Sequence, residues 1–448
     1  MPNEIARILP PSGWRSPNRR QFLTGAALLG GAAATGTLAG CGGPAAAGEE
    51  TLRFWHLLSG GDGVKMQAMI DRVNAESPDF DVVPTVLAWG TPYYTKLAMA
   101  SAGGRPPELA IMHASRIPGY APGGLLDAWD LDELAKRDVS KETFADRVWA
   151  SGELDGDIFS IALDSHPFIA MYNTDVAGEA GLLGSDGLLT EITDPERFLE
   201  AMREMQAVTG GHGLSYGYIN DGAQMWRLFY TLYRQHGAEM ALNSGQPADV
   251  DRDVAIDCLT YITSLLDDTI CASGADINNA IAEFATGGSG MLFSGVWELP
   301  TMQDAGIAFD AMTIPTLFGT PAAYADSHAF VLPHQNDVDE ARRAAAYDFV
   351  ANILKGSLSW AEAGHIPAYQ PVVNSEEYRS LEPQVHYANA AEIINYDPRA
   401  WFTGSGSDFQ TFFAANVQNV FLGREAPDVG WDAFVDRLNT ILSKPNPV

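Results

Sequence analysis

The chain has 448 residues and carries 27 Lys and Arg against 57 Asp and Glu, a formal net charge of −30 at pH 7. So acidic a surface repels phosphate backbones and anionic lipid head groups, which makes nucleic acid a poor candidate partner. Because 46% of the residues are hydrophobic, we expect a folded protein and not a disordered acidic segment. The length is too great for one ordinary core and favours two lobes.

The first 40 residues have the parts of an export signal. Arg19 and Arg20 precede Phe22 and a run rich in Ala, Gly and Leu that continues to residue 40. This run is too short and too weakly apolar to cross a bilayer, which needs about 20 apolar residues. We therefore predict an export signal peptide of the twin-arginine type over residues 1–40.

The Leu-Ala-Gly sequence that precedes Cys41 resembles the bacterial lipobox. The resemblance implies that Cys41 becomes the lipidated first residue of the mature chain, with residues 41–50 as a flexible tether. We expect an extracytoplasmic protein that is anchored to the outer face of the cell membrane through this lipid only.

Two further cysteines, Cys258 and Cys271, follow in the mature chain. An oxidising compartment permits a disulfide between them. Cys258 also occupies an apolar position of a predicted helix, where a buried free thiol is equally compatible. The sequence leaves both states open.

Strands and helices alternate in the first part of the chain. The pattern predicts strands over residues 52–55, 80–87 and 108–112. The helix between the first two strands buries one apolar face, which consists of Met66, Met69, Ile70 and Val73. This rhythm is typical of an α/β layer.

The rest of the chain is richer in helices. Asp194 is the predicted N-cap of a helix over residues 195–208, which begins with Pro195. Strands return at 307–314 and 329–332. Apolar periodicity predicts further helices over 222–235, 251–266, 337–354, 409–422 and 431–442.

Tryptophan or histidine residues stand at the ends of three predicted strands. Trp55 and His56 end the first strand, Trp89 follows the second, and His113 follows the third. Open α/β sheets bind ligands at the carboxyl edge of their strands. An aromatic ring packs on the C–H face of a sugar, and an imidazole donates or accepts a hydroxyl hydrogen bond. These four residues are therefore candidates for a sugar site.

Four short segments in a fixed order suggest a family. They are Phe54–His56, Ile161–Asp175, Phe284–Leu299 and Ala363–Tyr369. Taken together behind a lipobox, they resemble the bacterial extracellular solute-binding proteins of the maltose-binding type. The resemblance implies an α/β, two-lobe periplasmic-binding-protein-like fold with a ligand cleft between the lobes, no cofactor and no catalytic chemistry.

The same resemblance implies a role and a division of the chain. The protein would be the substrate-binding component of an ABC importer, which captures a sugar or oligosaccharide and delivers it to the permease subunits in the membrane. We expect residues 51–163 and 304–335 to form the N-terminal lobe. Residues 164–303 and 336–448 would form the C-terminal lobe, with chain crossings near 163–164, 299–303 and 333–337.

Further candidate ligand-binding residues come from these segments and from loops. Asp164 stands at the predicted crossing, where an acidic residue of related proteins accepts sugar hydroxyls, and His166 follows it. Trp226 is a weaker candidate because its helix also predicts core packing. The remaining candidates lie in loops or beside a returning strand and are Trp297, His328, His365 and Trp401.

Metal and catalytic motifs are absent from the sequence. No His-Glu-x-x-His pair occurs, Cys258 and Cys271 are thirteen residues apart, and no Gly-x-Ser-x-Gly elbow occurs. We therefore expect no metal site and no enzyme. A secreted glycoside hydrolase stays open as an alternative, because its two carboxylates are easily found in so acidic a chain.

A second alternative is a glycerol-phosphate- or polyol-binding protein of the same family, since the Phe54–His56 segment also resembles relatives of that kind. A phosphate requires Arg or Lys side chains that converge on it. Arg53, Arg116 and Arg399 are available but form no cluster in the sequence.

Overall fold

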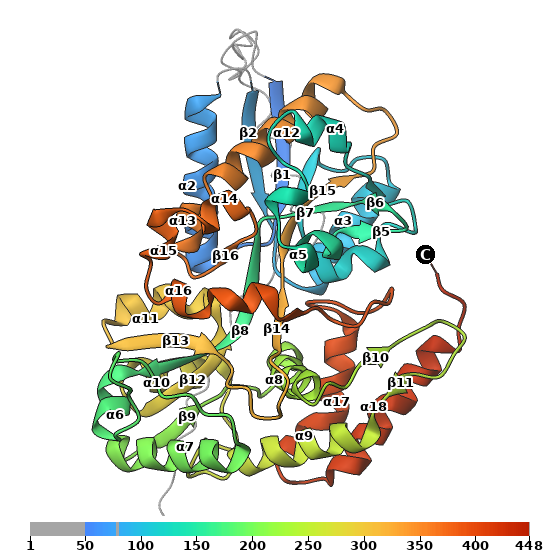
Figure 1. Ribbon diagram of the computed structural model, residues 1–448. Helices are drawn as coiled ribbons and strands as arrows, with labels where there is room; N and C mark the ends of the chain where they lie inside the picture. The colour runs from blue at the N-terminus through green and yellow to red at the C-terminus, as the bar shows by residue number, and fades with distance from the viewer. Residues whose placement is uncertain (1–49, 78–79, 448) are drawn as a thin grey trace, which may run out of the picture. The chain divides into compact units, whose positions relative to one another are not determined.

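The computed structural model describes residues 50–77 and 80–447, which form two large sheets with helices around each (Figure 1) and two small two-stranded sheets. In the first sheet, β1 (Glu50–His56) lies between β2 (Phe80–Val86) and β3 (Leu109–His113), and the three strands are parallel. β15 (His328–Pro333) runs antiparallel beside β3. The three N-terminal strands were all predicted, because parallel strands joined by helices give the alternating pattern.

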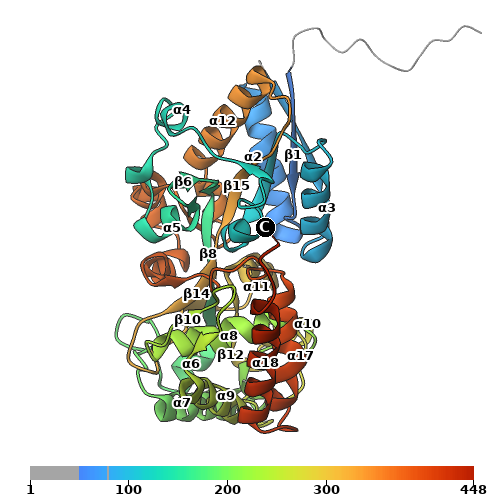
Figure 2. The same cartoon turned by 90° about the vertical axis from the view of Figure 1, so that its right-hand side faces the viewer.

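Helices cover both faces of the first sheet (Figure 2). Side chains at successive positions of a strand point to opposite faces. Leu109 and Ile111 of β3 therefore pack with α2 (Gly60–Glu76) and α12 (Glu340–Lys355), whereas Ala110 and Met112 pack with α3 (Thr91–Ala102). The predicted apolar face of α2 is confirmed, since all four of its residues are buried.

The second sheet is arranged around β8 (Asp164–Asn173), a ten-residue strand that is buried along its whole length. β12 (Ser289–Gly295) and β13 (Phe309–Thr313) flank its second half. β14 (Ala323–Asp326) and β16 (Ile366–Pro367) pair with its first residues. The sheet is completed by β9 (His212–Ser215) beside β12 and by β17 (Ile394–Asn395) beside β14.

The two faces of β8 belong to different cores. Phe168, Ala170 and Tyr172 pack into a large helical core, whereas Ile169 and Met171 point to the opposite face. The large core is formed with α7 (Pro195–Thr209), α8 (Gly222–Gln235), α9 (Arg252–Leu265), α17 (Asp408–Phe421) and α18 (Pro427–Leu442). The opposite face is covered by α10 (Ile277–Ala285), α11 (Leu299–Ala305) and α16 (Gln384–Tyr387).

A local signal sets the start of α7 as predicted. The Asp194 carboxylate accepts a hydrogen bond from the Arg197 backbone N–H at 2.8 Å, and Pro195 occupies the first turn. The helix ends at Gly210, which adopts a left-handed conformation with φ 68°.

The chain passes between the lobes three times. The third crossing follows Val372 and leads to α16 of the second lobe, and the first two are extended segments. β7 (Ser160–Ala162) pairs with β15 in the first sheet, and β8 begins two residues later. Ser327 separates β14 of the second sheet from β15 of the first. The two crossings run side by side, because Ala325 and Asp326 pair with Pro167 and His166. They bring Asp164, His166 and His328 to the junction of the lobes.

The packing corrects the predicted lobe boundaries in two segments. Residues 309–326 form β13 and β14 of the second sheet, although they were assigned to the N-terminal lobe. α12, Trp360 and residues 368–372 pack in the core of the first lobe, although the sequence predicted the C-terminal lobe for them. The crossings expected near 299–303 and 333–337 are therefore wrong, because Leu299 and Met302 fill the second lobe and α12 fills the first.

Cys258 and Cys271 are both buried free thiols. Among the described residues, no helix has the length and apolar character needed to span a membrane. The predicted signal peptide over residues 1–40, Cys41 and the tether up to residue 49 lie outside the described residues.

Candidate ligand-binding site

A cavity of about 600 Å³ lies beside the crossing strands and is lined by both lobes. The first lobe contributes the start of α2, Trp89 after β2 and His113 at the end of β3. The second lobe contributes the start of α8 and the short helix η3 (Val296–Glu298). The volume falls within the range of about 300–1,000 Å³ that small-molecule sites have.

Trp297 of η3 supplies an aromatic wall of this cavity. Its ring folds back over Gly295, where an added Cβ would meet ring carbons at 2.0–2.3 Å. Only glycine leaves room for the ring at that position, so the Gly-Val-Trp sequence itself directs the indole to the cavity. The ring also meets the imidazole of His166 edge-on, with ring centroids 6.1 Å apart.

Arg227 of α8 brings a positive charge to the same wall. Its guanidinium carbon lies 4.6 Å from the centre of the Trp297 ring, and its Nη1 donates to Gln224 Oε1 at 3.2 Å. The residue is only 9% exposed, and its Nε has no hydrogen-bond partner. Within residues 50–77 and 80–447 it forms no ion pair with a carboxylate, so a buried cation faces the cavity.

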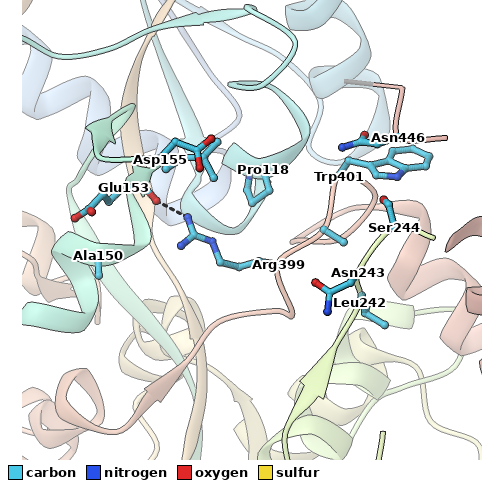
Figure 3. A pocket seen from close by; sticks show the side chains of 12 residues that line it. Pro118, Ala150, Glu153, Asp155, Leu242, Asn243, Ser244, Arg399, Trp401 and Asn446 are labelled. Carbon is cyan, nitrogen blue, oxygen red and sulfur yellow. Dashed lines mark hydrogen bonds between the residues drawn. The ribbon is translucent and has the colours of Figure 1, made fainter. Parts of the chain in front are cut away.

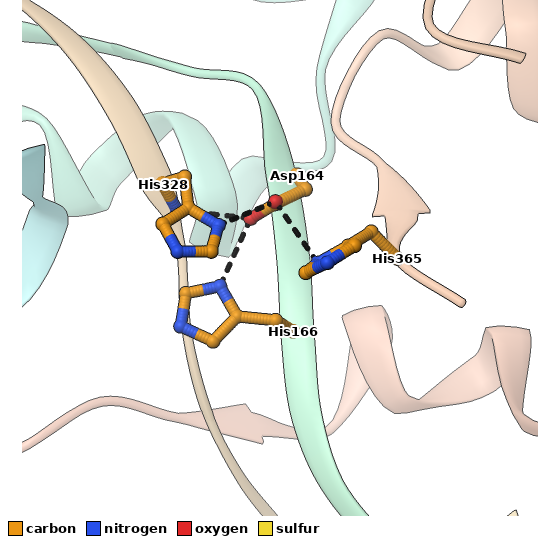
Figure 4. Close-up of side chains that lie close together, drawn as sticks. All are labelled: Asp164, His166, His328 and His365. Atoms are coloured by element: carbon orange, nitrogen blue, oxygen red, sulfur yellow. Dashed lines mark hydrogen bonds and ion pairs between the residues drawn. The ribbon is translucent and has the colours of Figure 1, made fainter. Parts of the chain in front are cut away.

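Three buried histidines, His113, His166 and His328, line the cavity. His166 and His328 stack with ring centroids 4.2 Å apart, and His113 lies 5.3 and 5.0 Å from them. The Asp164 carboxylate accepts from Nδ1 of His166 at 3.0 Å and from Nδ1 of His328 at 2.8 Å (Figure 4). These bonds fix both rings with their Nε2 atoms directed away from Asp164.

The protonation states follow from burial. Burial, and next the charge of His328, lower the pKa of His166 to about 4. Burial likewise holds the pKa of His113 well below its ordinary value. Both rings are neutral near pH 7. With the Nδ1 proton of His166 directed to Asp164, its Nε2 presents a lone pair that accepts a hydrogen bond from a ligand hydroxyl.

His365 supports the cluster from behind. Its Nε2 lies 3.0 Å from Asp62, its Nδ1 lies 3.2 Å from Asp164, and its ring stacks on Trp360 at 4.4 Å. Burial by itself lowers the pKa of His365, but the two carboxylates outweigh it and raise that pKa to about 10. Burial likewise acts to raise the pKa of Asp164, but the surrounding imidazoles outweigh it and hold that pKa well below its ordinary value.

The family described as "Bacterial extracellular solute-binding protein" matches residues 68–380 of the chain. The chain belongs to this family. The curated relatives include the sn-glycerol-3-phosphate-binding periplasmic protein UgpB of Shigella flexneri, which is 24% identical over 179 residues. That match covers 39% of the chain and 39% of the relative, so the chain spans well under half the length of the curated relatives it matches.

Solved structures of solute-binding proteins share the fold over their whole length. The GacH receptor of Streptomyces glaucescens, solved unliganded and with acarbose, aligns with a TM-score of 0.73 at 17% identity and covers 88% of this chain and 99% of its own. UgpB from Mycobacterium tuberculosis in complex with glycerophosphocholine aligns with a TM-score of 0.72 at 18% identity over the same shares. At such identities the likeness shows the fold alone, which is the predicted two-lobe α/β fold.

Five of the predicted site residues of this solute-binding protein line the cavity together: Trp89, His113, His166, Trp297 and His328. Two others, Asp164 and His365, lie directly behind them and are buried. Asp164, which we predicted to bind ligand hydroxyls itself, is buried and does not line the cavity. Its oxygens already accept bonds from His166, His328 and the Trp360 indole N–H at 2.6 Å, so its role is to orient the histidines.

Four predicted residues lie away from the cavity: Trp226, His56, Trp55 and Trp401. Trp226 is fully buried in the second lobe and donates its indole N–H to Asp397, as its helical spacing allowed. His56 is buried behind the strand end, with no hydrogen-bond partner at either ring nitrogen. Trp55 lies in a separate shallow hollow under the Lys96 ammonium, which is 5.1 Å from its ring.

Trp401 lines a second, larger cavity of about 660 Å³ (Figure 3). Arg399, Glu153 and Asn243 line it as well, and Arg399 donates to the Glu153 carbonyl across it. This cavity has a single aromatic residue and no histidine, so the cavity beside the crossing strands is the stronger candidate for a sugar site.

Sequence analysis missed Arg227, Asp62 and Asp221 as lining residues. Asp221 caps α8 by accepting from the Gln224 backbone N–H at 3.0 Å, and Asp62 lies in the first turn of α2. The one available signal for Arg227 was its own charge, because Arg227 interrupts the otherwise apolar segment from Trp226 to Tyr233.

Proposed function

We propose that this protein is the substrate-binding component of an ABC importer, and that it captures a sugar or oligosaccharide between its lobes for delivery to the permease. One observation carries the proposal: Trp89 and Trp297 from opposite lobes share a cavity with three imidazoles. Aromatic faces pack against sugar C–H groups, and neutral imidazoles pair with hydroxyls. The proposal includes no catalytic step.

A second candidate is a polyol that carries a phosphate group. The observation that favours it is Arg227, a buried guanidinium in the cavity that forms no ion pair with a described carboxylate. A phosphate would accept bidentate hydrogen bonds from such a group. The matched curated relatives bind glycerol 3-phosphate by name, and one solved relative holds glycerophosphocholine.

A thermal-shift screen against sugars, polyols and their phosphate esters tests both candidates. A ligand at about 100 times its Kd stabilises the folded state by about 2.7 kcal/mol, which raises the melting temperature. We expect sugars to produce the shift in the wild type and in Arg227→Gln. If phosphate esters alone raise the melting temperature, and Arg227→Gln removes that rise, then the phosphate-binding function holds instead.

Two results would contradict both candidates. If no member of either class raises the melting temperature, the cavity assignment is wrong. Release of cleaved product from labelled oligosaccharides would mean that the protein is a glycoside hydrolase and not a binding protein.

We further propose that the mature chain begins at a lipidated Cys41 on the outer face of the cell membrane. The lipobox-like sequence and the extracellular family support this proposal. Mass spectrometry of the membrane-extracted protein should find lipid on Cys41, and Cys41→Ala should release the protein from the membrane. An unmodified Cys41 would contradict it.

A further inference from the structure

Four side chains at the lobe junction form a set suited to a metal ion. Asp164 and His166 of β8, His328 of β15 and His365 before β16 each offer one ligand atom, and these atoms all lie within 4.8 Å of one another (Figure 4). All four residues are buried. We infer that this cluster binds a divalent transition-metal ion of the Zn²⁺ type, independently of which solute the cavity captures.

The donor set selects the class of ion. Three imidazole nitrogens and one carboxylate oxygen suit Zn²⁺ and its neighbours, whereas Mg²⁺ and Ca²⁺ prefer oxygen ligands only. Ligands at about 2.0–2.1 Å from a tetrahedral zinc lie about 3.3–3.4 Å from one another. The Asp164 oxygens already lie 3.0, 2.8 and 3.2 Å from Nδ1 of His166, His328 and His365. Small outward shifts would therefore admit the ion.

The contacts of His365 match those of a metal-binding histidine. Its Nδ1 is buried and forms an ion pair with Asp164 at 3.2 Å, inside the cluster. Its other nitrogen is held by Asp62 at 3.0 Å. A carboxylate that holds the far nitrogen of a histidine is the usual support of a metal-binding imidazole, because it fixes the ring and its tautomer.

Further contacts hold the ligands in place around the proposed ion. Asp164 accepts from the Trp360 indole N–H at 2.6 Å and from the His328 backbone N–H at 2.9 Å. The Trp360 ring also stacks on His365. These bonds fix the carboxylate and one imidazole, so little ordering would remain to be done when the ion binds.

Coordination requires a rearrangement of protons at the three imidazoles. Each ring binds the ion through its Nδ1 lone pair, so the Nδ1 protons leave. His166 and His328 then carry their protons on Nε2, the nitrogens that point away from Asp164. His365 keeps its proton on Nε2 toward Asp62, and protons in excess pass to water.

Local spacing in the sequence does not reveal this cluster. Asp164 and His166 are two residues apart on a strand, but His328 and His365 arrive from segments 164 and 201 residues beyond Asp164. Two strand crossings and the turn before β16 bring them together. The expectation of no metal site rests on motifs whose residues are close together in the sequence. It does not apply to a cluster whose residues come from distant segments.

The test is a Zn²⁺ titration of the whole protein, purified without a histidine tag and stripped with chelator. Competition with a chromophoric chelator should report one ion per chain, and Mg²⁺ should not compete. His365→Gln should weaken Zn²⁺ binding by at least about 100-fold, and Asp62→Asn by about 10–100-fold. His334→Gln is the matched control, because His334 pairs with Asp127 outside the cluster and should leave binding unchanged.

X-ray absorption of the wild type with one Zn²⁺ keeps the inference testable if a variant fails to fold. It should show three imidazole nitrogens and a carboxylate oxygen about 2.0–2.2 Å from the metal. The inference would be overturned by the absence of stoichiometric Zn²⁺ binding or by a spectrum that shows fewer than two imidazoles. It would also be overturned if folded His365→Gln bound Zn²⁺ as tightly as the wild type does. Solute binding is measured separately, in the presence of chelator, and tests the proposed function. Either proposal can therefore fail while the other holds.

Discussion

Trp297 is the residue whose loss should separate ligand binding from folding. Its indole forms a wall of the cavity and contacts Arg227 and His166, but it is not part of the fully buried core. We expect Trp297→Ala to cost about 2–4 kcal/mol of binding free energy, the range of a binding hot spot. Calorimetric titration with the solute found in the screen measures this change.

Trp55→Ala is the control for that substitution, since Trp55 lies in a hollow outside the cavity. It should bind the solute as the wild type does. If Trp297→Ala binds normally and instead unfolds at a much lower temperature without ligand, then Trp297 acts in packing and the cavity assignment is wrong.

The buried histidines should make stability depend on pH in opposite directions on the two sides of neutrality. His166, with a pKa of about 4, stays neutral in the folded state while the unfolded chain binds a proton below pH 6.5. Stability should therefore fall as the pH drops from about 6.5 to about 4. His365, with its pKa raised to about 10, keeps a proton that the unfolded chain releases above pH 6.5. Its stabilising contribution is lost as the pH rises from about 6.5 to about 10.

Chemical denaturation across pH 4–10 measures this dependence, with chelator present to exclude metal effects. The free energy of unfolding should peak near pH 6.5. His365→Gln should be less stable at the peak and should lose much of the decline on the alkaline side. An alkaline decline that is unchanged in His365→Gln would show that other groups cause it.

At the scale of elements, α8 combines a packing face with a binding end. Its packing face places Trp226 in the aromatic core, stacked on Tyr230 with ring centroids 4.9 Å apart and edge-on to Phe409. Its first turns present Gln224 and Arg227 to the cavity. Trp226→Ala should cost about 3–5 kcal/mol of stability, the usual cost of removing a buried aromatic. Denaturant unfolding measures it.

The solute affinity of folded Trp226→Ala should stay close to that of the wild type, because Trp226 does not line the cavity. A variant with nearly wild-type stability and lost affinity would instead place Trp226 in the binding site, as the sequence allowed.

The elements could be predicted because local signals determine them. The N-cap at Asp194, the apolar face of α2 and the short apolar runs of β1 and β3 all act within a few residues. The lobe boundaries could not be predicted in the same way. Whether α12 covers the first or the second sheet depends on distant partners such as Phe54 and Ile111, which its own sequence does not specify.

The site was predicted where it follows from strand ends. His113 and Trp89 were found because the ends of parallel strands meet at one edge of a sheet. Arg227 was missed because it lies on a helix whose neighbours are core residues. The contacts of Asp164 with His328 and His365 could not be predicted, because these residues come from segments that are distant in sequence.

For the whole molecule, the crossing strands determine how the lobes can move. β8 and the β14–β15 segment join the lobes beside the cavity, and their pairing at Pro167 and Ala325 keeps them together. A solute that contacts Trp89 on one lobe and Trp297 on the other gains both contacts only when the lobes approach. We expect saturating solute to reduce the radius of gyration in small-angle X-ray scattering.

Trp297→Ala provides the comparison for this last prediction, because it removes the contact on one lobe and leaves the crossing strands unchanged. At a solute concentration that saturates the variant, the decrease in radius should be smaller than in the wild type, since less of the binding free energy depends on closure. A wild-type radius that does not change with bound solute would mean that the cavity is preformed. The two crossings would then act as a rigid connection and not as a hinge.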